Sequence, residues 1–120
     1  MPVRLIVHDV NEAVAFYRDL LGFALVRQYG PAMAVLTNAA DELWLAGPPS
    51  SAAQPMPDGR RPEPGGWNRL VVTLPDLAAT AAQLAAAGVP FRNAITSGAG
   101  GAQLLVEDPS GNPVELFQPA

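Results

Sequence analysis

The fold of this chain is decided near its end, by the sequence Asp108-Pro109-Ser110-Gly111-Asn112-Pro113-Val114-Glu115-Leu116-Phe117-Gln118-Pro119. Its first six residues are types that preset or permit turn dihedrals, so they predict a tight turn. The next five alternate as a strand does, with Val114 and Leu116 on one face. Glu115 and Phe117 therefore share the opposite face. A carboxylate beside a phenyl ring is unusual on a face that packs only against core, and it indicates the wall of a pocket.

Length and composition restrict the class of protein. The 120 residues fit one domain, or two small half-domains that share a core. The net charge of −4 argues against nucleic acid or an anionic membrane as the main partner. The lack of cysteine excludes disulfides, thiolate catalysis and cysteine metal sites. No apolar run approaches the roughly 18 residues of a membrane helix, and the first strand begins without a signal peptide, so we expect a cytoplasmic soluble protein.

The first half of the chain predicts a strand, a helix and three further strands. Residues 2–7 alternate as a strand, and Asp9 with Glu12 forms a capping-box pattern at the start of the helix. Gly22 follows the helix at the position that favours a left-handed cap. Three short strands are then predicted at residues 23–29, 32–38 and 42–46.

The second half repeats this order. Asp76 precedes a helix and Gly88 follows it, 12 residues apart, where the first half separates Asp9 from Gly22 by 13. The remaining elements are predicted as a strand at 69–74, a helix at 77–87 and strands at 89–95, 103–107 and 114–118. An internal repeat of this size says more about the fold than any single element does.

A proline-rich segment separates the two halves. Residues 47–66 contain six prolines, which deny a helix or a central strand their backbone donors. We expect a semi-rigid linker or arm. The predicted domain plan is a first module at residues 1–47, an arm at 48–66 and a second module at 67–120.

These features resemble the vicinal oxygen chelate superfamily, which includes glyoxalase I, extradiol dioxygenases, fosfomycin-resistance enzymes and bleomycin-resistance proteins. The motifs that carry the resemblance are Val7-His8-Asp9 leading to Phe16-Tyr17-Arg18-Asp19-Leu20-Leu21-Gly22-Phe23, Leu74-Pro75-Asp76-Leu77 with Ala86-Ala87-Gly88-Val89, and the turn and strand from Asp108 to Leu116. The resemblance implies an α+β fold of two βαβββ modules, with curled mixed sheets around a shared cleft and the helices outside. It leaves the activity open, because the superfamily contains both enzymes and pure binders on one scaffold.

The resemblance also implies where a divalent metal would bind. The four ligand positions of the superfamily's enzymes correspond here to Pro2, Trp44, Arg69 and Glu115. Only Glu115 can ligate a metal, whereas such a site needs at least two or three protein donors, and the always-cationic Arg69 would repel the ion. We therefore expect no metal and no cofactor. The single histidine, His8, is expected to be an ordinary surface residue near the outer end of its strand.

Arg69 and Glu115 are predicted to pair where the resemblance places the metal. The pair either fills the vacated position as a purely structural ion pair or serves as the polar anchor of an apolar pocket. Trp44 is expected to face the cleft, because its neighbours Leu43 and Leu45 would face the helix. For each aromatic residue taken alone, plain core packing is the favoured interpretation, and it is the three of them on one predicted concave face that favour stacking of a flat ligand. The predicted ligand-binding residues are Arg69, Glu115, Trp44, Phe117, Trp67 and Arg4.

Two classes of function follow. The first is a non-catalytic protein that sequesters or carries an aromatic or amphipathic small molecule, as the bleomycin-resistance branch does. The second is a metal-independent enzyme of the lyase or isomerase type, with Glu115 as general base and Arg69 stabilising an oxyanion. A carboxylate held by arginine is a poorer base, which favours the binder. A metalloenzyme with unorthodox ligands such as Asp41 or Glu42 is the remote alternative.

We also expect a homodimer, since dimers dominate soluble homo-oligomers. In it, the 48–64 arm would touch the partner or edge a cleft. A planar or aromatic small molecule is the expected ligand, with neither nucleic acid nor a membrane as a partner.

Overall fold

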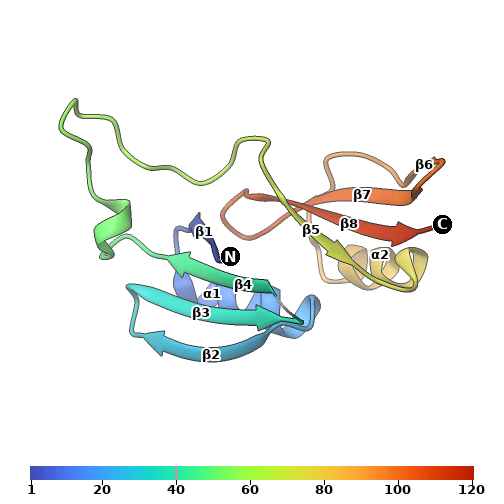
Figure 1. Ribbon diagram of the computed structural model, residues 1–120, viewed down its shortest axis with the longest axis horizontal. Coiled ribbons are helices and arrows are strands. Elements are labelled where there is room, and N and C mark those ends of the chain that lie inside the picture. The colour runs from blue at the N-terminus through green and yellow to red at the C-terminus, as the bar shows by residue number, and fades with distance from the viewer. Residues whose placement is uncertain (40) are drawn as a thin grey trace. The chain divides into compact units, whose positions relative to one another are not determined.

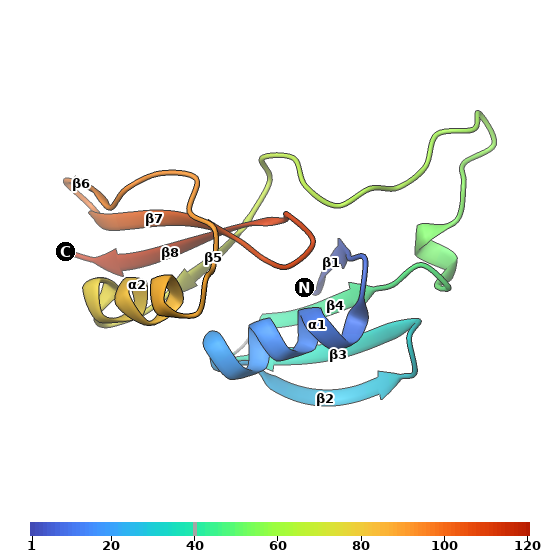
Figure 2. The same ribbon diagram turned by 180° about the vertical axis from the view of Figure 1, so that it is seen from behind.

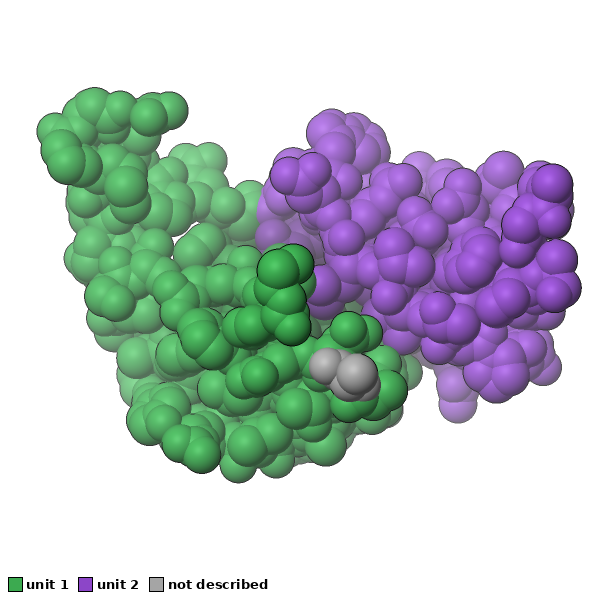
Figure 3. Space-filling model, viewed as in Figure 1, with its two compact units in different colours: residues 1–64 green, residues 65–120 purple. Residues whose placement is uncertain are grey.

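The computed structural model describes residues 1–39 and 41–120, which form two compact units, residues 1–64 and residues 65–120 (Figures 1 and 3). Each unit is a βαβββ module with a four-stranded mixed sheet and one helical segment against it. The predicted α+β fold of two βαβββ modules is therefore confirmed. In the described part of the chain, no helix is both long and apolar enough to span a membrane.

The first unit has a sheet in the order β1-β4-β3-β2, in which β1 is parallel to β4 and the other neighbours are antiparallel. Its elements are β1 (Val3–Ile6), α1 (Val10–Ala15), the π-helical turn η1 (Phe16–Leu20), β2 (Ala24–Tyr29), β3 (Met33–Asn38) and β4 (Asp41–Ala46), and the short 3-10 helix η2 (Ser51–Ala53) follows in the arm.

The helix of the first unit begins and ends as its sequence predicts. The Asp9 carboxylate accepts a hydrogen bond from the backbone N–H of Glu12 at 2.9 Å, and Gly22 has a φ of 77°. Tyr17 is fully buried, with its ring edge-on to Phe16 and Phe23 at centroid distances of 5.0 and 5.6 Å. Figures 1 and 2 show α1 lying on one face of the sheet, beside β3 and β4.

The second unit has the equivalent strand order, β5-β8-β7-β6, with β5 parallel to β8. Its elements are β5 (Leu70–Thr73), α2 (Leu77–Ala86), β6 (Thr96–Gly98), β7 (Gly101–Glu107) and β8 (Pro113–Pro119). Asp76 accepts from the backbone N–H of Ala79 at 3.0 Å, and Gly88 has a φ of 79°. Leu77, Ala81 and Leu84 of α2 are buried. They form the helical side of a core whose sheet side includes Leu104 and Leu116.

The strand predicted at residues 89–95 is wrong in its position. The regular strand β6 lies later, at Thr96–Gly98, and Phe91 makes only an isolated bridge with Val106. Pro90 has no backbone donor, and the side chain of Asn93 accepts the hydrogen bond of the Leu105 N–H at 2.8 Å. The Asn93 side chain thus accepts the hydrogen bond that a backbone carbonyl of a neighbouring strand would accept from Leu105, and this interrupts regular strand pairing with β7.

The last strands of the two units place their residues in the same way. Leu43 and Leu45 flank Trp44 and are buried on the helix side of β4, as Val114 and Leu116 are on either side of Glu115 in β8. Trp44 and Glu115 themselves are half-buried, and each lies on the face of its own sheet that points away from the helix. The predicted alternation of β8 is therefore confirmed.

Candidate functional site

The first open face is the sheet face opposite α1, and by strand register it comprises Arg4, Val35, Thr37, Glu42 and Trp44. All of these except the exposed Arg4 are half-buried. Apolar and polar side chains therefore alternate on a surface that has no helix against it, which is the composition of a small-molecule site.

Trp44 is held in place from two directions. The Arg4 guanidinium carbon lies 5.0 Å from the centroid of the indole ring, within the range of a cation–π contact. The indole Nε1–H donates a hydrogen bond to Glu42 Oε1 at 2.8 Å. The plane of the ring is thereby fixed before any ligand arrives, which lowers the entropy cost of stacking on it.

The second open face is the sheet face opposite α2 and comprises Val71, Gln103, Leu105, Glu115 and Phe117. Leu105 is buried here, whereas Val71 is 52% exposed. The face therefore runs from a closed centre at β7 and β8 to an open edge at β5.

Glu115 is the centre of a polar cluster on the second open face. Arg69 Nε lies 3.2 Å from Glu115 Oε1, and the two side chains are 34% and 14% exposed. The Gln103 amide is assigned with its nitrogen toward Glu115. In this orientation it donates to Glu115 Oε2 and Oε1 at 3.1 and 3.2 Å. The predicted pairing of Arg69 with Glu115 is thus present, together with a third group that the sequence did not indicate.

A cavity of about 30 Å³ adjoins this cluster. It is lined by Arg69, Asn93, Gln103, Leu104, Leu105 and Glu115. This volume suits about one water molecule, so the cavity itself is too small for an organic ligand.

The sequence profile of the Glyoxalase/Bleomycin resistance protein/Dioxygenase superfamily matches residues 2–116, across both βαβββ units. The chain belongs to this superfamily. No curated protein matches it.

Solved structures of the superfamily share the fold at low sequence identity. The antibiotic-binding protein TnmS3 from Streptomyces sp. CB03234 is 26% identical, with a TM-score of 0.74 over 99% of this chain and 93% of that one. A superfamily member from Sphaerobacter thermophilus DSM 20745 is 26% identical, with a TM-score of 0.76 and coverages of 98% and 94%. Lactoylglutathione lyase from Agrobacterium tumefaciens is 23% identical, with a TM-score of 0.76 and coverages of 98% and 91%.

The four residues predicted to stand at the superfamily's metal-ligand positions do not have the chemistry of a divalent-ion site. Glu115 is the single carboxylate among them; it forms a salt bridge with Arg69 and accepts hydrogen bonds from the Gln103 amide. A cation there would replace those donors and face the charge of Arg69. Among residues 1–39 and 41–120, no three His, Cys, Asp or Glu side chains come together as a metal-binding group.

Trp67 belongs to a different cluster from the one predicted. It is 72% exposed, and the Arg92 guanidinium carbon lies 4.6 Å from the centroid of its ring. Arg92 also donates to Glu107 Oε2 at 2.8 Å and to the carbonyl oxygens of Gly66 and Gly111 at 2.7 and 3.0 Å. Arg92 was not predicted, because its partners are two backbone carbonyls and a residue 15 positions away.

The six predicted ligand residues therefore fall into three groups. Arg4 and Trp44 form a cation–π contact in the first unit, and Arg69 and Glu115 form a salt bridge in the second. Phe117 shares the second open face with Glu115 and is half-buried, whereas Trp67 contacts Arg92.

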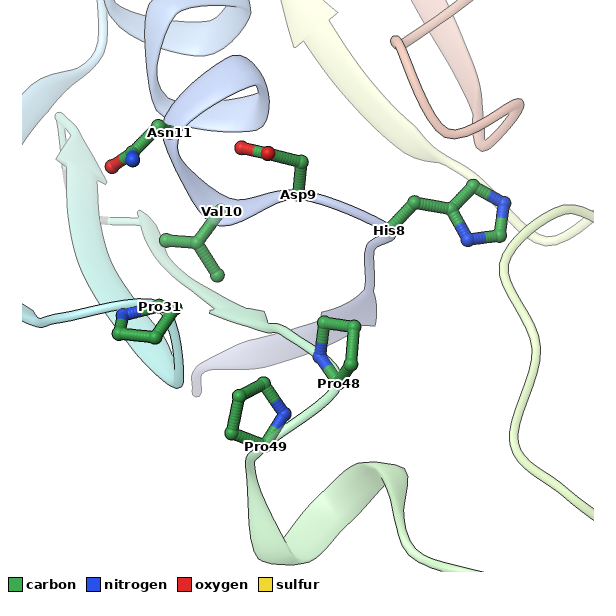
Figure 4. Close-up of a pocket in the computed structure, with 7 residues that line it drawn as sticks. All are labelled: His8, Asp9, Val10, Asn11, Pro31, Pro48 and Pro49. Atoms are coloured by element: carbon green, nitrogen blue, oxygen red, sulfur yellow. The ribbon is translucent and has the colours of Figure 1, made fainter.

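A pocket of about 240 Å³ lies beside the N-terminal end of α1, away from all six of these residues. Figure 4 shows its lining, which is His8, Asp9, Val10, Asn11, Pro31, Pro48 and Pro49. The Val10 side chain points toward the prolines, whereas the His8 imidazole points away from them (Figure 4). The pocket arises where the start of the helix meets two proline segments that are distant in sequence, so local sequence patterns did not indicate it.

Proposed function

We propose that this protein is a non-catalytic binder of a planar, partly polar small molecule, which it sequesters or carries. The observation that supports this most is the contact of Arg4 with Trp44 on the first open face. The indole is half-buried, its N–H is held by Glu42, and a planar cation lies against its ring. An aromatic ligand stacks on this pair, and an acceptor group at its edge receives hydrogen bonds from the guanidinium.

The arrangement around Glu115 supports a binding role over a catalytic one. A general base takes up a proton, and a proton on Glu115 would cancel the charge that pairs with Arg69 Nε at 3.2 Å. A metal-independent reaction through Glu115 would therefore have to break this ion pair when the proton is transferred. The similarity to an antibiotic-binding protein of the same superfamily is a further argument for a binder.

Tryptophan fluorescence provides a direct test, because the chain has only two tryptophans. Trp67→Phe leaves Trp44 as the single emitter and removes none of the first open face. We expect a panel of aromatic antibiotics and metabolites to contain compounds that quench this variant in a saturable way, with the same affinity as wild type.

Calorimetry with Trp44→Ala completes the test. Stacking contributes about 0.5–1.5 kcal/mol beyond area burial, and the lost apolar contact adds to it, so affinity should fall by at least about tenfold. Trp67→Ala is the matched control and should bind as wild type does. Equal binding by Trp44→Ala would place the ligand elsewhere, and conversion of a bound compound that disappears in Glu115→Gln would establish the enzyme instead.

A further inference from the structure

A second cavity in the first unit, of about 260 Å³, is lined on one side by the arm. One wall is the end of β1 and the residues after it, and the other is the arm itself. The lining residues are Ile6, Val7, His8, Pro48, Ala53, Gln54, Arg61, Pro62, Glu63 and Pro64. His8 and Pro48 line both this arm cavity and the pocket of Figure 4.

The start of the arm is locked by hydrogen bonds. Gln54 Nε2 donates to the carbonyl oxygens of Pro48 and Ser50 at 3.1 and 2.9 Å, and Ser50 Oγ donates to the Gly47 carbonyl at 2.7 Å. Gly47 in turn packs so closely on Pro31 and Val10 that a β-carbon there would overlap both. The wall that carries Pro48 is therefore preorganised, which lowers the cost of binding a ligand against it.

The lining of the arm cavity includes one positive side chain, Arg61, and one negative side chain, Glu63. Among the described residues, neither Arg61 nor Glu63 takes part in a salt bridge, whereas the adjacent Arg60 is paired with Asp58 at 2.7 Å. Arg61 and Glu63 are both exposed. Two unpaired opposite charges on the lining of one cavity are complementary to a ligand that itself carries both charges.

The remaining lining is mainly apolar. Proline rings at positions 48, 62 and 64, with Ile6 and Val7, give a surface on which a hydrocarbon or phenyl group loses contact with water. The volume suits a single small molecule rather than a peptide.

We propose that the arm cavity is a second ligand site, for a zwitterionic molecule with an apolar substituent, such as an α-amino acid with an aromatic side chain. Its carboxylate binds the Arg61 guanidinium and its ammonium binds the Glu63 carboxylate. Its side chain packs on the proline rings. The two charged residues of this site belong to neither open face, so the proposal does not depend on the function proposed above.

The single histidine gives the test a local reporter, and the variants of Arg61 and Glu63 distinguish the arm cavity from the pocket of Figure 4, which His8 also lines. His8 lines the cavity, and it contributes the only imidazole resonance of the protein. We expect L-phenylalanine to shift this resonance in a saturable NMR titration. N-acetyl-L-phenylalanine lacks the cation and L-phenylalaninamide lacks the carboxylate, so each should bind at least about tenfold more weakly.

Matched variants complete the experiment. Arg61→Gln and Glu63→Gln should each weaken L-phenylalanine by at least about tenfold, while Arg60→Gln and Asp58→Asn leave its affinity unchanged. Trp44→Ala should also leave it unchanged, which separates this site from the first open face. The proposal is overturned if L-phenylalanine gives no saturable shift of His8, if both analogues bind as tightly as it does, or if the Arg61 and Glu63 variants bind as the controls do.

Discussion

Trp44 and Glu115 occupy corresponding positions in two units that share one architecture, yet their surroundings differ completely. Each lies on the helix-free face of the last strand, between two buried aliphatic residues. In the first unit the position holds an indole against the cation of Arg4, and in the second it holds a carboxylate among the donors of Arg69 and Gln103. The comparison shows that the buried side of a strand maintains the fold, while the other side is free to vary in chemistry.

The two helices differ in the same instructive way. The helical segment of the first unit buries the aromatic residues Phe16 and Tyr17, whereas α2 buries Leu77, Ala81 and Leu84. Each fills the space over a sheet of the same strand order. Different side-chain volumes thus complete equivalent cores, since packing constrains the sum of the volumes more than each residue.

The largest expected effect tests whether the buried sides of the two strands are truly equivalent. Leu45 and Leu116 are both 0% exposed, so Leu45→Ala and Leu116→Ala should each lower the free energy of unfolding by about 2–5 kcal/mol. Urea denaturation monitored by circular dichroism measures both. A loss below about 1 kcal/mol in one variant alone would show that its strand is not a core strand of the same kind.

An intermediate effect is expected from the charged position of the second unit. Arg69→Met leaves the mostly buried Glu115 without its cation, so it should destabilise the protein by about 1–3 kcal/mol. Arg69→Met combined with Glu115→Gln should recover most of this loss, because no charge is then left unpaired. A double-mutant cycle by chemical denaturation measures the coupling. If the single variant is as stable as wild type, solvent already screens the pair.

The smallest effect distinguishes the two arginine–tryptophan contacts. Arg4→Gln should cost about 0.5–1 kcal/mol, the value of an exposed cation–π contact. Arg92→Gln should cost more, because Arg92 also holds Glu107 and the carbonyls of Gly66 and Gly111. Thermal melts compare the two variants, with Arg60→Gln as a surface control. Equal losses would mean that the additional hydrogen bonds of Arg92 add no stability.

Much of the fold could be predicted because its signals are local. Asp9 and Asp76 accept from the N–H three residues on, and Gly22 and Gly88 adopt the positive φ that glycine permits. The strand predicted at 89–95 failed for the opposite reason. Whether it pairs depends on Asn93 reaching Leu105, a contact between segments that no periodicity records.

The candidate site was predictable in its faces but not in its partners. Alternation alone put Trp44 and Glu115 on the sheet face opposite their buried aliphatic neighbours. The partners of these residues depend on how separate segments meet. Strand register brings Arg4 to Trp44, and the packing of segments distant in sequence brings Gln103 to Glu115 and Arg92 to Trp67. The arm was expected to touch a partner or edge a cleft, but the residues of the first unit that line a cavity with it had no local sequence signal.

The sequence by itself determined the two βαβββ units, their helix boundaries and the division of each last strand into a buried and an open side. These depend on dihedral preference and on hydrophobic periodicity, which act within a few residues. Only the tertiary structure decided which side chains meet on the open sides and where cavities form. Those outcomes depend on distances between segments 15 to 47 residues apart, as in the contacts of Arg92 with Glu107 and of Gly65 with Asn112.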